Sequence, residues 1–309
     1  MRARRSPVTW FGGKGRMLGP LMALMPEHQH YVEPFGGGAW LLIRKEPCAG
    51  CETYNDLDEG LTAFFRVISR EETFWRFRDR VALLPCARTM WKDFRLGWSQ
   101  QEDDVERAAQ WWLVARQSFA GVWGNSWGSA VCSSTGGMSS QAARWINAIA
   151  GLPEVHARLQ RVQIEQQDGV RILNRYQGPG YLAYCDPPYV MSTRKSGSYR
   201  HEMTDAQHQD LVQALLGYQG AVMLSGYRSG LYAPLEKAGW RRADFAVTCS
   251  AVGRTRASGR QGTGSMRPED KRLESVWLNP EAIARHGVPF EELAARAAAT
   301  KAHQPTAAD

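Results

Sequence analysis

The chain has 309 residues, of which 43% are apolar and 22% charged, and its formal net charge is +7. This composition excludes wholesale disorder, and no apolar run approaches the roughly 18 residues of a membrane span. The length fits one large domain or two modest ones, and the basic excess permits an anionic partner without requiring one. The basic first residues have no apolar stretch behind them, so we expect a soluble cytoplasmic protein with no membrane partner.

The first sixty residues alternate short strands with glycine turns. The pattern predicts a strand over 30–33, a glycine turn over 34–38, a helix from 39 and a second strand over 51–54. Such a β-α-β unit implies a parallel pair of strands with a ligand crevice at their carboxyl ends. An acidic cluster follows the second strand: Asp56, Asp58 and Glu59.

Residues 61–160 differ in character from what precedes them. Helical periodicity dominates 61–84 and 105–119, and eight of the twelve tryptophans lie in this part of the chain. A polar, Gly/Ser-rich loop covers 121–140. These features predict an inserted, mostly helical subdomain whose tryptophans at helical spacing are mostly core.

The alternating pattern resumes near Val162. Four further elements are predicted: strands over 181–185 and 221–225, a helix over 204–216, and a hairpin of 245–249 with 273–278 around a basic, Gly-rich loop. From residue 281 the chain is Ala-rich, which predicts one helix and a frayed tail. The division expected is therefore an α/β domain over 1–60 and 161–280, an insert over 61–160 and a C-terminal tail over 281–309.

Six cysteines are spread along the chain, and only Cys48 and Cys51 form a C-x-x-C pair. A structural zinc site usually needs a second such pair or two histidines at matching spacing, and the sequence has neither. We therefore expect no bound metal, and free thiols in a reducing compartment.

The sharpest motif is Asp186-Pro187-Pro188-Tyr189, directly after a predicted strand. Because proline cannot continue the strand, the aspartate is held at the strand's carboxyl end, where open α/β sheets bind ligands. A carboxylate and a fixed backbone carbonyl can accept both N–H bonds of an aromatic amino group, which makes that nitrogen more nucleophilic and offsets its developing charge. Tyr189 offers a flat face on which a base can stack. Taken alone, the four residues equally fit an ordinary Asp-Pro turn.

Two glycine-containing motifs precede it. The turn from Glu33 to Gly38 lets a ligand approach the backbone closely, and Asp56 is placed to accept hydrogen bonds from ribose hydroxyls. Neither a G-K-[ST] ending nor G-x-G-x-x-G is present, which favours an adenosine-containing ligand without a phosphate clamp. In the Trp10–Lys14 stretch, Lys14 can face a carboxylate and Trp10 can pack on an apolar or sulfonium edge.

Together these motifs resemble the D12 class of DNA N6-adenine methyltransferases, the Dam-like family. The match consists of W-x-G-G-K at 10–14, V-E-P-F-x-G-x-[AG] at 32–39, N-D-L at 55–57 and D-P-P-Y at 186–189. Their order is that of the α group, and the matching positions span most of the chain. The segment from Tyr199 to Thr204 further resembles phage-borne members of the family.

The resemblance implies a Rossmann-like methyltransferase domain with a DNA-recognition insert, S-adenosylmethionine as donor and an extrahelical adenine in double-stranded DNA as acceptor. It implies catalysis by Asp186, Pro187, Pro188 and Tyr189. It implies donor binding by Trp10, Gly12, Gly13, Lys14, Glu33, Pro34, Phe35, Gly36, Gly38, Asp56, Asp168 and Asp186. The candidates for DNA contact are Arg88, Arg116, Trp123, Asn125, Arg194 and Lys195. Ala120 replaces the asparagine of the family's Phe-Asn-Gly segment.

We therefore expect a site-specific DNA adenine methyltransferase, bacterial or phage-encoded and associated with the nucleoid, acting with a restriction endonuclease or as an orphan. Two alternatives stay open. One is a different methyl acceptor, such as N4 of cytosine or adenine in RNA. The other is a non-catalytic DNA-binding homologue.

Overall fold

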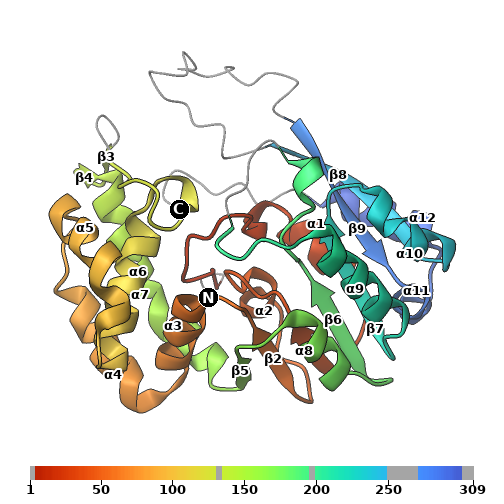
Figure 1. The fold of residues 1–309 in the computed structure, drawn as a ribbon, viewed down its shortest axis with the longest axis horizontal. Coiled ribbons are helices and arrows are strands. Elements are labelled where there is room, and N and C mark those ends of the chain that lie inside the picture. The colour runs from red at the N-terminus through yellow and green to blue at the C-terminus, as the bar shows by residue number, and fades with distance from the viewer. Residues whose placement is uncertain (1–3, 130–133, 195–198, 249–270, 301–309) are drawn as a thin grey trace.

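The computed structural model of the chain describes residues 4–129, 134–194, 199–248 and 271–300. Its centre is a seven-stranded sheet in the order β5-β2-β1-β6-β7-β9-β8 (Figure 1). The strands are β1 His30–Glu33, β2 Glu52–Asn55, β5 Val162–Glu165, β6 Tyr181–Cys185, β7 Ala221–Gly226, β8 Arg241–Thr248 and β9 Lys271–Leu278.

Of the seven strands described, β9 alone runs against the others, pairing antiparallel with both β7 and β8. From β1 the chain moves outward through β2 to β5, whereas β6 and β7 extend the sheet on the other side of β1. The order therefore reverses between β1 and β6, and a switch point of this kind opens a crevice at the strands' carboxyl ends. The predicted Rossmann-like methyltransferase sheet is confirmed, including the final hairpin.

The helical insert, which we define as the segment between β2 and β5, stands beside the sheet (Figure 1). Its helices are α3 Glu59–Ser69, α4 Glu71–Ala82, α5 Arg88–Gly97, α6 Asp104–Gln117 and α7 Ser140–Leu159, and it includes the short hairpin of β3 Ser134–Thr135 and β4 Met138–Ser139. The buried Trp112 ring on α6 stacks on Phe64 of α3 at 5.9 Å. One hydrophobic cluster contains these side chains together with Tyr31 and Leu182 of the sheet. The insert and one face of the sheet therefore share a continuous core.

The stretch of helical periodicity over 61–84 contains two helices in the structure. Arg70 has extended backbone angles (φ −101°, ψ 133°), so the periodic stretch over 61–84 forms α3 and α4 rather than one helix. The break is stabilised locally, because the Thr73 hydroxyl donates to the Val67 carbonyl oxygen at 2.6 Å. Glu71 and Glu72 then occupy the first turn of α4, where acidic side chains favour a new helix start.

The expected tail after residue 281 is also more ordered than predicted. Helix α11 (Pro280–His286) and helix α12 (Phe290–Ala299) pack against the fold, and α12 lies against α1 (Leu18–Ala23). Phe290, Leu293 and Ala297 are buried along one side of α12. The sequence pattern does not indicate this apolar stripe, because the many alanines of the stretch are compatible with either the buried or the exposed face of a helix.

The remaining helices cover the sheet: α2 Trp40–Arg44, α8 Gly169–Arg175, α9 Asp205–Leu216 and α10 Ala233–Lys237. Within the described ranges, none of the helices combines the length and the apolar character needed to span a bilayer.

Candidate functional site

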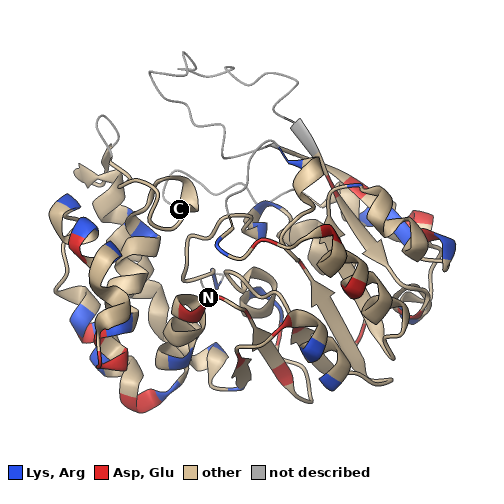
Figure 2. Ribbon diagram, in the orientation of Figure 1, with Lys and Arg blue, Asp and Glu red and all other residues tan. Residues whose placement is uncertain are grey.

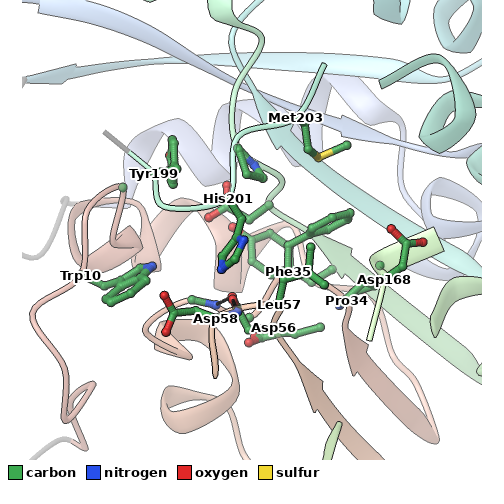
Figure 3. Close-up of a pocket in the computed structure, with 18 of the residues that line it drawn as sticks. Trp10, Pro34, Phe35, Asp56, Leu57, Asp58, Asp168, Tyr199, His201 and Met203 are labelled. Carbon is green, nitrogen blue, oxygen red and sulfur yellow. Dashed lines mark hydrogen bonds between the residues drawn. The ribbon is translucent and has the colours of Figure 1, made fainter. Parts of the chain in front are cut away.

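A cavity of about 540 Å³ lies at the carboxyl ends of β1 and β6 (Figure 3). Its volume falls within the usual range of small-molecule sites, about 300–1,000 Å³. Its lining includes the 10–14 loop, the glycine turn after β1, the acidic turn after β2, the start of α8, the start of the Asp186 motif, 199–203 and part of α9. The switch point of the sheet thus brings together motifs that are far apart in the sequence.

The glycine turn packs directly on the neighbouring strand. A Cβ atom on Gly36 would stand 2.1 Å from the Tyr54 ring, so only glycine permits this approach. The Tyr54 hydroxyl donates to the Gly37 carbonyl oxygen at 2.7 Å, which fixes the turn. At its base, the buried Glu33 accepts hydrogen bonds from the Tyr31 hydroxyl at 2.6 Å and the Leu42 amide at 2.8 Å. Burial raises the pKa of Glu33 to about 7, although both hydrogen bonds oppose the shift.

Asp56 and Asp58 lie side by side on the cavity wall but have different tasks (Figure 3). Asp56 accepts hydrogen bonds from the backbone amides of Gly37 and Asp58, both at 2.8 Å, which hold its carboxylate in place. Burial raises the pKa of Asp56 to about 6, and these two amides partly offset the rise. Asp58 caps α3, since its carboxylate accepts from the Leu61 amide at 2.9 Å.

A buried ion pair joins the first motif to the last. Lys14, which is 5% exposed, places its Nζ 2.8 Å from Asp186 Oδ2 and 2.9 Å from the Gly12 carbonyl oxygen. The same Nζ lies 4.9 Å from the centre of the Tyr189 ring. Burial alone would lower the pKa of Lys14, but the attraction of Asp186 raises it above the usual range. Lys14 therefore keeps its charge in this site.

The second carboxylate oxygen of Asp186 has no such partner. Oδ1 is buried and makes no hydrogen bond to any residue that the structure describes. Leaving a buried acceptor unpaired costs about 1–3 kcal/mol, so the free oxygen marks a place for a ligand's N–H group. Burial raises the pKa of Asp186 to about 6, and Lys14 partly offsets the rise. The buried Tyr189 ring contacts Tyr227 edge-on, with ring centres 4.7 Å apart.

The opposite end of the cavity is formed by Phe35 and the start of α8. Asp168 is exposed and caps α8, accepting from the Val170 and Arg171 amides at 3.0 and 3.1 Å. A Cβ atom on Gly169 would stand 2.5 Å from the Phe35 ring, so the ring rests on this glycine. Trp10, Gly12, Gly13, Pro34 and Gly38 also line the cavity, as does Pro188 of the Asp186 motif.

Three of the residues expected to contact DNA, Arg88, Trp123 and Asn125, lie in or beside the loop that follows α6. Arg88 is exposed at the first position of α5, with its guanidinium 5.0 Å from the centre of the Trp127 ring, and Asn125 is exposed on the following loop. Trp123 is half-buried against Trp111, with ring centres 6.4 Å apart.

The other candidates have structural neighbours. The guanidinium of Arg116 packs against Arg144, where burial lowers its pKa to about 10, and its buried Nε makes no hydrogen bond to the described residues. The side chain of Arg194 is 4% exposed and forms an ion pair with Glu202. Lys195 lies outside the described residues, as does most of the basic loop between β8 and β9.

The structure also brings in residues to which sequence reasoning gave no role. Tyr199, His201 and Met203 line the cavity across from Asp56 and Asp58 (Figure 3), and Arg200 lines it too, with its guanidinium 3.1 Å from Asp58. The signal was the resemblance of this stretch to phage-borne members, but only the fold shows what the stretch covers. No group of three or more metal-ligating side chains occurs in the described ranges, where Cys48, Cys51, Cys86 and Cys185 are free thiols.

A protein-family model described as D12 class N6 adenine-specific DNA methyltransferase matches residues 10–229. The matched range begins at the Trp10 loop and includes both turns of the cavity, the helical insert, the Asp186 motif and the 199–203 segment. A search of curated proteins finds no match to the chain.

Proposed function

Since the chain belongs to the D12 class of N6 adenine-specific DNA methyltransferases, we propose that it moves a methyl group from S-adenosylmethionine to an adenine turned out of double-stranded DNA. It is an enzyme of DNA adenine methylation. The observation that carries the finer assignment is the half-buried Asp186 carboxylate, with one oxygen held by Lys14 and the other, Oδ1, buried and without a partner among the described residues.

The cavity suits the donor. Asp56 is fixed by two backbone amides and, with its remaining lone pairs, can accept hydrogen bonds from both ribose hydroxyls. Phe35 and Asp168 offer an apolar face and an acceptor for the adenine ring, and the glycine turn admits close contact with the backbone. Trp10 can pack on the sulfonium edge. When bound there, S-adenosylmethionine supplies an electrophilic methyl group attached to a cationic sulfur.

The catalytic motif suits the acceptor. Asp186 Oδ1 can accept one N6–H bond of adenine, and a backbone carbonyl of the Pro187-Pro188 turn can accept the other, which favours a tetrahedral, nucleophilic nitrogen. As N6 gains the methyl carbon, positive charge develops on the nitrogen, and the carboxylate offsets that charge. Lys14 keeps Asp186 ionised and fixes its orientation, so little reorganisation is needed during the reaction.

Adenine must leave the base stack to reach this site, at a cost of a few kcal/mol. The Tyr189 ring, which contacts Lys14 and Tyr227, can stack on the extruded base. Site specificity is assigned to the helical insert, because the catalytic pocket meets only the one extruded base. Arg88 and Asn125 are its exposed candidates for contact. The enzyme acts either with a restriction endonuclease or as an orphan.

Transfer of labelled methyl groups from S-adenosylmethionine to DNA tests this function. We expect the wild-type chain to form N6-methyladenine in duplex DNA, and to prefer the duplex over single-stranded DNA and RNA of the same sequence. The Asp186→Asn variant should lose transfer, whereas Asp79→Asn, on the exposed surface of α4, should retain it. Absence of transfer by the wild-type chain across a mixed-sequence genomic DNA would reject the assignment.

A further inference from the structure

The segment Tyr199–Met203, which we call the strap, crosses the donor cavity between the Asp186 motif and α9 (Figure 3). It has no helix or strand of its own, and α9 begins only at Asp205, after Thr204 closes a capping box with Gln207. Because the strap gains no stability from a regular backbone ladder, its position depends on the contacts of its side chains.

The first contact is with the sheet side of the cavity. The Tyr199 hydroxyl lies against Gly12, where a Cβ atom would stand 2.6 Å from it, and the Tyr199 ring meets Phe11 edge-on at 5.1 Å. The Tyr199 amide donates to Glu202 Oε1 at 3.1 Å. Glu202 in turn pairs with Arg194, whose guanidinium lies 5.1 Å from the centre of the Tyr199 ring. The strap is therefore held by a hydrogen bond between two of its own residues, Tyr199 and Glu202, and it packs on the 10–14 loop.

The second contact crosses to the helical insert. Arg200 Nη1 lies 3.1 Å from Oδ2 of the buried Asp58, which caps α3. Asp58 lies next to Asp56, the proposed acceptor for the ribose hydroxyls of the donor. The same guanidinium lies 5.2 Å from the centre of the Trp123 ring and 5.8 Å from that of Trp98. Both tryptophans belong to the insert. Trp123 stacks on the buried Trp111, so the contact is continuous with the insert's core.

Arg200 is therefore the point at which the strap, the acidic turn and the insert meet. We propose that Arg200 is a positioning residue: it holds the strap over the methyl donor, and it makes retention of the donor depend on how the insert is packed. The inference builds on the proposed function, since it takes S-adenosylmethionine as the donor. DNA bound to the insert can change donor retention only through a difference in such contacts between two states.

Two variants of Arg200 separate its charge from its planar contact. Arg200→Met removes both the ion pair and the interaction with the tryptophans, and Arg200→Lys keeps the charge while losing the planar guanidinium. Arg78→Met is the matched control, because it also removes an arginine above a tryptophan ring (Trp75, 4.7 Å) but on the exposed face of α4. Titration calorimetry and stopped-flow release would measure donor affinity and residence time.

We expect Arg200→Met to weaken S-adenosylmethionine binding at least fivefold and to speed its release by a similar factor. Arg200→Lys should lie between it and the wild type, and Arg78→Met should match the wild type. Thermal melts of all variants exclude global unfolding as the cause. Wild-type affinity and release in Arg200→Met would overturn the proposal. The proposal would also be overturned if Arg200→Met bound the donor normally but bound every DNA duplex more weakly by the same factor, with a shallower salt dependence of DNA binding. That result would show that Arg200 contacts a phosphate.

The insert's part is tested by combining Arg200→Met with Trp123→Leu. If the two side chains act as one contact, the double variant should bind the donor no more weakly than Arg200→Met alone. Multiplied effects would show that donor retention does not depend on this contact.

Hydrogen exchange of the 199–204 peptide gives a readout that needs no donor. Arg200→Met should speed it and Arg78→Met should not. A wild-type chain that binds no S-adenosylmethionine would refute the proposed function. In that case an unchanged exchange rate in Arg200→Met would refute the positioning role separately.

Discussion

At the scale of single residues, the site is defined by a difference between two oxygens of one carboxylate. Asp186 Oδ2 is bound by Lys14, and Oδ1 is buried without a partner among the described residues. The sequence motifs predicted that both residues line the site, but the ion pair between them joins positions 172 residues apart (186 minus 14). The sequence predicted that Lys14 faces a carboxylate, but only the folded chain, which brings the 10–14 loop to the carboxyl end of β6, shows that this carboxylate is Asp186.

Replacing Asp186 by asparagine should abolish methyl transfer without removing donor binding. The amide keeps the side chain's size but loses the charge that offsets the positive nitrogen, so we expect kcat to fall by about 10²–10³-fold or more. Radiolabel transfer measures the rate and calorimetry measures donor affinity. Because Lys14 would lose its ionic partner, thermal melts must accompany both. A variant that keeps more than about a tenth of the rate loses under ~1.4 kcal/mol, and the catalytic role would then be wrong.

The pH profile should follow the same carboxylates. Burial raises the pKa of Asp186 and of Asp56 to about 6, and both must be ionised for their proposed tasks. Activity should therefore be full near pH 8 and fall as pH drops through 6, with kcat/KM declining about tenfold per pH unit or more steeply. Donor affinity, which depends on Asp56 in this proposal, should fall over the same range. A kcat/KM that stays constant down to pH 5 would contradict these roles.

Glu33 gives a separate prediction about stability. Burial raises its pKa from an ordinary 4.5 to about 7, so the folded state holds a proton that the unfolded state releases between these values. The stability of the wild type therefore decreases as pH rises through this window, by about 1.4 kcal/mol per unit of pKa shift at most. Glutamine does not titrate, so Glu33→Gln removes this pH dependence. The free energy of unfolding of the variant, relative to that of the wild type, should therefore rise by ~1–3 kcal/mol from pH 5 to pH 8. Urea unfolding at the two pH values measures the difference, and an equal ΔΔG at both would refute it.

At the scale of elements, the sequence predicted strands better than helix boundaries. Each strand next to the site is a short apolar run that ends in a turn motif, as at Pro34 and Pro187. These turn signals lie in the adjacent residues, so they can be recognised in the sequence. The break at Arg70 is not marked by proline or glycine, because it depends on the Thr73 hydroxyl and on the packing of α3 against α6 and α7. Helix α12 was hidden by its alanines, and its buried stripe becomes visible only beside α1.

The turn that follows α6 stores backbone strain. Ala120 is exposed and has a left-handed conformation (φ 56°, ψ 18°), which costs an L-residue with a Cβ about 1–2 kcal/mol. Ala120→Gly should therefore raise the free energy of unfolding by about 1 kcal/mol. The same substitution at Ala82, at the end of α4, should instead lower it by up to ~1 kcal/mol. Denaturant unfolding of both variants gives the signs, and a loss of stability at position 120 would show that the turn is unstrained.

At the scale of the whole molecule, the insert and the sheet work as one body around the site. Their hydrophobic core is continuous, and the strap joins them again through Arg200 above the cavity. Basic residues are scattered over the helices of the insert and mixed with acidic ones rather than gathered in a stripe (Figure 2). The DNA surface therefore could not be predicted from arginine counts, because burial and ion pairs decide which cations are free to bind a phosphate or a base.

Arg88 and Arg116 should consequently respond differently to substitution, although both were predicted from the sequence to contact DNA. Arg88 is exposed at the start of α5, and a base-edge contact from it would contribute ~1–3 kcal/mol of discrimination between cognate and singly substituted duplexes. Arg88→Ala should then relax the preference at one flanking position by about tenfold or more. Arg116 is half-buried and its guanidinium donates to the Arg144 carbonyl oxygen, so Arg116→Ala should change the melting temperature first and all duplexes alike.

Methylation rates on a panel of singly substituted duplexes, taken with thermal melts, test this assignment. Arg78→Ala on α4 is the surface control, because that arginine is exposed and pairs with its neighbour Asp79. If Arg88→Ala instead weakens all sequences equally and lowers the salt slope by about one, Arg88 contacts a phosphate and the flanking bases are recognised elsewhere. If Arg116→Ala changes sequence preference at an unaltered melting temperature, its guanidinium must leave its place beside Arg144 when DNA binds. The packing of the free protein would then not be that of the complex.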